Sequence, residues 1–191
     1  MQIHEAQQDV RLVYVGGFFG QLVAGGLWLI AAAVGTFSAP VVAIAILLLG
    51  GILIFPVTML CLRMVGRPAS LPAGHPMAGL ATQIAFTFPL GLLVALAVTG
   101  YRLDWFFAAA MVIVGAHYLP FVFLYGMRIY AVLAGILALG GVGLALWGPR
   151  LFSLGAWSTG LVLVTFAFLL RSAVRTEVAT SAQVAPPDHT R

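Results

Sequence analysis

The fold is decided by one apolar stretch near the N-terminus, residues 12–62, "LVYVGGFFGQLVAGGLWLIAAAVGTFSAPVVAIAILLLGGILIFPVTMLCL". It contains no Asp, Glu, Lys or Arg. A membrane-spanning helix needs about 20 mainly apolar residues. The stretch is therefore long enough for two such helices, joined at "GTFSAP", residues 35–40.

Four further charge-free runs follow, at residues 68–101, 105–127, 129–149 and 151–170. Only 7% of the chain is charged, against roughly one quarter in soluble domains. We therefore predict an all-α polytopic membrane bundle with spans at about 12–35, 40–62, 77–99, 105–127, 129–148 and 151–170. The connecting loops are short, so residues 1–175 should form one domain, and the polar tail 176–191 should be disordered.

The arginines predict the orientation of this bundle. With six spans, both termini lie on one side of the membrane. That side would carry most of the basic residues: Arg11, Arg63, Arg67, Arg128, Arg171, Arg175 and Arg191, against Arg102 and Arg150 opposite. Cytoplasmic loops are enriched in Lys and Arg, so we expect both termini in the cytoplasm of a multi-pass inner (plasma) membrane protein. The lipid bilayer, rather than nucleic acid, then explains the basic composition.

The N-terminus and the small residues refine this prediction. We expect no cleavable signal peptide, because residues 1–11 are polar and the apolar stretch after them is too long. Ile3, Ala6 and Val10 recur at helical spacing, which predicts a short interfacial helix before the first span. Small residues such as Gly16 and Gly20 favour close helix packing within the bundle. Whether the bundle assembles further into a homo-oligomer stays open on the sequence.

The polar residues inside the spans are the candidate site. His117 lies near the middle of the fourth span, and intramembrane ionisable residues are functional candidates by default. Gln21 shares one helix face with Gly17, Gly25 and Trp28, so another helix can approach its amide closely. The full set of ligand-binding candidates is His117, Gln21, Gln83, Tyr118, Tyr125 and Arg128.

Three prolines interrupt successive spans: Pro56, Pro89 and Pro120. Each removes one helical hydrogen bond and leaves the carbonyl four residues earlier without its usual donor. Such a carbonyl needs another partner in hydrocarbon. Together with the polar residues, these kinks predict a polar pocket in the inner half of the bundle.

Three functions remain open on these residues. His117 could serve a transporter or channel-like protein for a small polar solute, or it could hold together a structural or regulatory subunit with no chemistry of its own. It could also be the general base of an enzyme acting on a lipid or quinone, although no second strong acid or base accompanies it. The single cysteine, Cys61, excludes internal disulfides and cysteine-rich metal sites. We predict no cofactor and no metal, and we expect His75 to be a surface residue.

Several stretches also resemble a known family, in order and in spacing. These are "YVGGFFGQLVAGGLWL" at residues 14–29, "ILIFP" at 52–56, "YRLDWFF" at 101–107 and "GAHYLPF" at 115–121, followed by "YGMRIY" at 125–130. They are similar to an uncharacterised family of small bacterial polytopic membrane proteins, a domain of unknown function. The resemblance implies a bacterial inner-membrane location and brings no activity or site residues.

Overall fold

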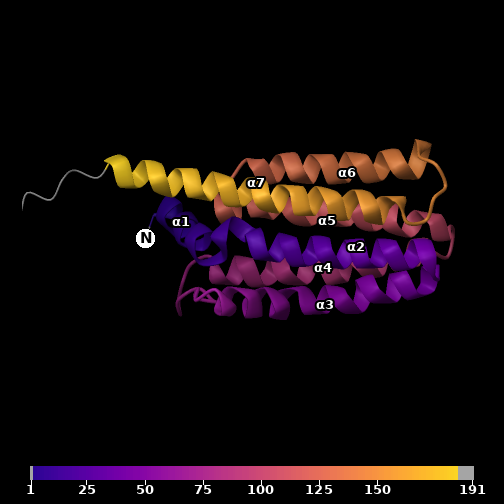
Figure 1. Ribbon diagram of the computed structural model, residues 1–191, viewed down its shortest axis with the longest axis horizontal. Helices are drawn as coiled ribbons and strands as arrows, with labels where there is room; N and C mark the ends of the chain where they lie inside the picture. The colour runs from indigo at the N-terminus through magenta and orange to yellow at the C-terminus, as the bar shows by residue number, and fades with distance from the viewer. Residues whose placement is uncertain (1, 185–191) are drawn as a thin grey trace, which may run out of the picture.

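A computed structural model describes residues 2–184, and the side chains of residues 2–176 within them. All regular structure in this part of the chain is helical, and six helices are long and apolar enough to cross a membrane. Figure 1 shows them side by side along one axis, with the N-terminus and the end of the last helix at the same end of the bundle. The predicted all-α, six-span membrane architecture is confirmed.

The helices follow the predicted spans closely in the middle of the chain. Their bounds are α1 Ile3–Tyr14, α2 Phe18–Phe37, α3 Pro40–Met64, α4 Ala78–Val98, α5 Phe106–Tyr125, α6 Ile129–Trp147 and α7 Leu154–Val184. Two short 3-10 turns, Val15–Gly17 and Leu103–Trp105, precede α2 and α5.

The first span differs from its predicted start at residue 12. The helix breaks after Tyr14, where Val15, Gly16 and Gly17 have φ angles of 52°, 62° and 84°. Glycine adopts such left-handed conformations at little cost. The Tyr130 hydroxyl donates a 2.7 Å hydrogen bond to the Gly16 carbonyl and so satisfies part of the broken backbone. The short helix α1, with one apolar face, corresponds to the predicted interfacial segment.

The last helix is longer than predicted. Helix α7 continues past residue 170 and through the first part of the tail to Val184, whereas the sequence predicts disorder from residue 176. The reason is local: residues 171–184 contain no Gly or Pro and are rich in good helix formers, and the first helix-breaking pair is Pro186–Pro187. The rest of the predicted tail, residues 185–191, lies outside the described part.

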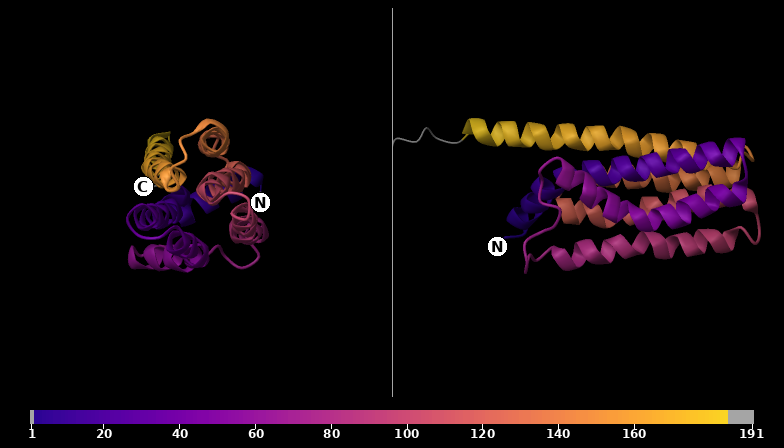
Figure 2. Two further views of the ribbon diagram at one scale, coloured as in Figure 1. Left: turned by 90° about the vertical axis from the view of Figure 1, so that its right-hand side faces the viewer. Right: turned by 60° about the horizontal axis from the view of Figure 1, so that its bottom comes forward.

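Two helix pairs pack with their backbones in close approach. Between α2 and α7, a Cβ placed on Gly25 would lie 3.2 Å from the Gly160 carbonyl oxygen. Between α5 and α6, a Cβ on Gly115 would lie 2.7 Å from the Ala138 nitrogen. Helix α2 also packs along α3, and α5 along α4, but α3 and α4 touch each other only sparsely. The two views in Figure 2 show α3 and α4 at the edge of the bundle.

Candidate functional site

A cavity of about 170 Å³ lies among α2, α3, α4 and α5. It occupies the half of the bundle that carries α1 and the α3–α4 loop, between Tyr14 at that end and Trp28 deeper in the bundle. A water molecule needs roughly 10–15 Å³ measured in this way. The cavity therefore has room for several waters or one small organic molecule.

The Gln21 side chain at this cavity is buried but has no hydrogen-bond partner among the described residues. The residue lines the wall of the cavity and is 2% exposed. Its amide nitrogen and its amide oxygen both have no hydrogen-bond partner among the described residues. Trp28 lies two turns further along the same face of α2. Its indole nitrogen is also buried and has no hydrogen-bond partner among the described residues. A buried polar group left unpaired costs about 1–3 kcal/mol. Both residues border the cavity, so a small shift of either side chain would let its polar atoms reach a partner bound there.

His117 lies across the cavity on α5. Its Nδ1 is 2.7 Å from the Thr87 hydroxyl of α4, and that hydroxyl donates to the Ile84 carbonyl at 2.8 Å. The Thr87 hydroxyl has one proton, which can serve either the Ile84 carbonyl or the His117 Nδ1. The imidazole therefore pairs with Thr87 in either tautomer, and its Nε2 is a hydrogen-bond acceptor in one tautomer and a donor in the other.

Aromatic rings surround this histidine. The centroids of the Phe88, Tyr118 and Phe121 rings lie 5.8, 5.5 and 5.2 Å from the imidazole centroid. Tyr125 stacks on Phe121 at 5.7 Å, and it lines the cavity together with Tyr118. The wall around His117 is therefore aromatic, with two phenol side chains as further polar groups.

The structure brings four of the six predicted ligand-binding residues to this cavity: His117, Gln21, Tyr118 and Tyr125. The other two do not line it. Gln83 is exposed on the outer face of α4, and Arg128 is exposed at the start of α6. The helix-kink residues also divide, because Pro89 lines the cavity whereas Pro56 is exposed on α3 and Pro120 lies within α5 away from the wall.

The sequence reasoning missed the roles of Trp28 and Thr87. Trp28 was placed on the same face as Gln21, which was the available signal for a shared wall. Thr87 lies one helical turn after Gln83, and it is Thr87 that meets the histidine. The two residues share one face of α4 and differ by one turn in depth, and the spacing in sequence does not show at which depth α5 brings its histidine.

Helix α1 caps the end of α5 beside the cavity. The Arg11 guanidinium donates to the Tyr125 carbonyl and the Gln7 amide donates to the Phe123 carbonyl, each at 2.6 Å. These carbonyls belong to the last turn of α5, where helical partners are missing and where a positive charge is favourable. Arg11 is only 4% exposed, so α1 is anchored firmly against the core.

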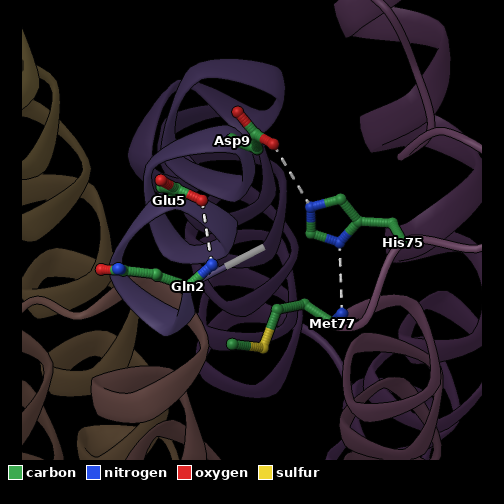
Figure 3. Close-up of polar contacts among 5 residues, drawn as sticks. All are labelled: Gln2, Glu5, Asp9, His75 and Met77. Atoms are coloured by element: carbon green, nitrogen blue, oxygen red, sulfur yellow. Dashed lines mark hydrogen bonds and ion pairs between the residues drawn. The ribbon is translucent and has the colours of Figure 1, made fainter.

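The loop between α3 and α4 packs against the other side of α1 (Figure 3). His75 accepts a 3.2 Å hydrogen bond from the Met77 amide, and its Nε2 lies 3.6 Å from the Asp9 carboxylate. Figure 3 also shows the Glu5 carboxylate accepting a hydrogen bond from the backbone N–H of Gln2 at the start of α1. His75 is 7% exposed, so its assignment as a surface residue is wrong: the proline-rich loop folds back and buries it.

Among the residues that the structure describes, no Asp, Glu, Lys, Arg or Cys side chain lines the cavity. Within the described residues, no group of three or more His, Cys, Asp or Glu side chains is placed to hold a metal ion. The described lining offers hydrogen-bonding side chains and aromatic rings.

Comparison with known proteins places the chain without assigning it an activity. No curated protein and no solved structure matches it. One family model matches residues 3–173, which is nearly the whole chain and includes every residue of the cavity wall. The chain belongs to the family described as "Family of unknown function (DUF7010)".

Proposed function

We propose that this protein is a small transporter-like membrane protein whose binding site is the cavity between Gln21, Trp28 and His117. The observation that carries the proposal is the Gln21 amide, buried on the cavity wall with both of its polar atoms unpaired. Polar side chains that only hold a membrane bundle together make hydrogen bonds across helices. An amide left unpaired beside a cavity suits a molecule that binds and leaves.

The surrounding helices support a site that opens and closes. Pro56 and Pro89 interrupt α3 and α4, the two helices with sparse mutual contact. Proline kinks are points where a helix bends, so these two helices are suited to moving against the more closely packed remainder. The arginine distribution supports placing the N-terminal end, and with it this half of the cavity, toward the cytoplasm of the inner membrane.

A structural or regulatory role without chemistry is the second candidate, and one observation favours it. The bond between His117 and Thr87 joins α5 to α4, which is what a residue holding the bundle together would do. This reading accounts for one nitrogen of His117. It does not account for Gln21 or Trp28, so we rank it second.

Cysteine labelling tests the proposed site directly. The background is Cys61→Ala, which removes the only native thiol, and Gln21→Cys then places a thiol on the cavity wall. The reagent is N-ethylmaleimide, which is small and crosses membranes. Ala110→Cys is the matched control, because Ala110 is fully buried on α5 and does not line the cavity.

We expect position 21 to react in folded protein while position 110 stays unreactive. A thiol reacts as its thiolate, so labelling requires a cavity with water in it. If neither position reacts in folded protein, the site is dry and packed, and the structural role replaces the proposed one.

A further inference from the structure

We infer that the cavity takes a neutral, lipid-soluble molecule with a planar ring that carries hydroxyl or carbonyl oxygens, as a quinone or quinol head does, and that this molecule arrives from the bilayer between α3 and α4. The inference rests on the proposed function, because it names the ligand class of the same cavity. Four features of the cavity lead to it: its mouth, its charge, its wall and its size.

The mouth of the cavity lies on the α3–α4 side. Among the lining residues, Phe55 of α3 is 56% exposed and Ala85 of α4 is exposed as well. The residues beside them on the outer surface are large and apolar: Ile52 is 63%, Phe86 64% and Leu90 63% exposed. Because these residues belong to membrane-spanning helices, the surface around the mouth faces lipid.

The end of the cavity toward α1 is more heavily covered. Tyr14 and Tyr125 bound it there, and beyond them lie the buried Arg11, which is bonded to the end of α5, and the buried His75 of the α3–α4 loop. Polar molecules from the aqueous side would have to pass this packed layer. The lipid-facing mouth is the more direct route.

The absence of charge on the described lining excludes charged ligands. None of the described residues that line the cavity is Asp, Glu, Lys or Arg. Moving an ion from water into such a site costs several kcal/mol unless an opposite charge compensates. A phospholipid headgroup, a free phosphate or an organic cation would find no counter-charge there, so the ligand is neutral.

The wall fits a planar ring with oxygen substituents. Phe88, Tyr118 and Phe121 present aromatic surfaces around His117, and aromatic rings pair well at centroid distances of about 4.5–7 Å. The His117 Nε2 accepts a hydrogen bond from a ligand hydroxyl in one tautomer and donates to a ligand carbonyl in the other. Gln21 and Trp28 border the cavity with N–H groups that have no partner among the described residues, and after a small side-chain shift these groups donate to a ligand carbonyl or hydroxyl oxygen.

The volume limits the ligand to one ring with a short attached group inside the cavity. A cavity of about 150 Å³ is enough for a benzene ring, and this one measures about 170 Å³. Any longer alkyl chain would extend through the mouth into lipid, which agrees with a lipid-soluble molecule.

Fluorescence quenching tests this ligand class. The chain has four tryptophans, and replacing Trp105, Trp147 and Trp157 with Phe leaves Trp28 as the only reporter, on the cavity wall. The protein is reconstituted in phosphatidylcholine–phosphatidylglycerol vesicles and titrated with decyl-benzoquinone, a lipid-soluble quencher. A variant that keeps only Trp147, which is 80% exposed, reports quenching from the bulk bilayer.

We expect saturable quenching of Trp28 and unsaturable quenching of Trp147. Gln21→Leu, made in the Trp28 reporter, should weaken the apparent affinity about tenfold, the ratio that corresponds to 1.4 kcal/mol of lost hydrogen bonding. Ala85→Phe, which narrows the mouth, should slow the approach to saturation. Thr82→Phe, exposed on α4 but not on the cavity wall, should leave the rate unchanged.

The outcomes separate this inference from the function on which it rests. If maleimide labels position 21 but Trp28 quenching does not saturate, the cavity is a binding site and the ligand class is wrong. If Trp28 is instead quenched by acrylamide from water, the ligand is an aqueous solute. Cross-linking of α3 to α3 between two copies, together with unsaturable quenching, would show that a second copy covers the mouth. Failure of both labelling and saturable quenching overturns both proposals.

Discussion

Two faces of the same bundle are built from similar apolar residues but pack very differently. Between α5 and α6, and between α2 and α7, Gly115 and Gly25 lie where the neighbouring backbone passes. Between α3 and α4, Gly51 makes only ordinary contact with the Phe88 and Leu92 side chains, and a proline lies inside each helix. In lipid, small residues hold helices together only where two of them meet. The difference explains why one side of the bundle is sealed and the other borders a cavity.

The largest expected loss of stability comes from disrupting the close packing of α5 against α6. Gly115→Ala would place a Cβ 2.7 Å from the Ala138 nitrogen and 2.9 Å from the Ala134 oxygen. These are backbone atoms, so α5 and α6 must separate, and we expect a loss of about 2–3 kcal/mol of stability. Thermal or denaturant unfolding in detergent measures it.

Gly135→Ala is the matched control on the same helix pair, because its Cβ would meet nothing within 4 Å. It should be neutral or gain up to about 1 kcal/mol from helix propensity. Equal losses for both variants would show that close backbone approach does not hold α5 to α6.

The next effect concerns the anchor between α1 and α5. Arg11→Leu removes the guanidinium that bonds the Tyr125 carbonyl, and we expect a loss of about 2 kcal/mol because that carbonyl loses a charged donor. The exposed Arg175→Leu on α7 should change stability by less than about 0.5 kcal/mol. A similar small change for both would mean that α1 is not anchored through Arg11.

On the cavity side, we expect a substitution to raise the stability of the protein instead of lowering it. Gln21→Leu removes two unpaired polar atoms from a buried position, so the ligand-free protein should gain about 1 kcal/mol of stability. Such a gain, paired with weaker ligand binding, is the usual trade-off at a functional site. A loss of stability instead would show that the amide has a structural partner.

The smallest effect measures the hydrogen bond between Thr87 of α4 and His117 of α5. A double-mutant cycle with His117→Ala and Thr87→Val should give a coupling free energy of about 0.6–1.7 kcal/mol, the size of interhelical hydrogen bonds in membranes. Thr82→Val, on the same helix but exposed and bonded only within it, should show no coupling to His117. Zero coupling for Thr87 would leave His117 without its described partner.

The sequence predicts the spans far better than the faces they present. Charge-free runs locate six membrane helices because hydrocarbon demands long apolar segments. Gln21, on the glycine-bearing face of α2, lines the cavity, whereas Gln83 does not. Gln83 and Thr87 lie one turn apart on the same face of α4, and their spacing does not show at which depth the histidine meets that helix; its partner is Thr87. His75 was misplaced for a similar reason: its burial depends on a loop folding onto α1, a contact between distant parts of the chain.

The most direct test of the central claim is an experimental density map of the protein in lipid nanodiscs, at a resolution that shows ordered water. The account predicts non-protein density, from water or a bound ring, within hydrogen-bond distance of the Gln21 amide and the Trp28 indole nitrogen. It also predicts an opening between Phe55 and Ala85. A map in which α3 and α4 close over an empty space, with the Gln21 amide bonded to a neighbouring helix, would contradict it.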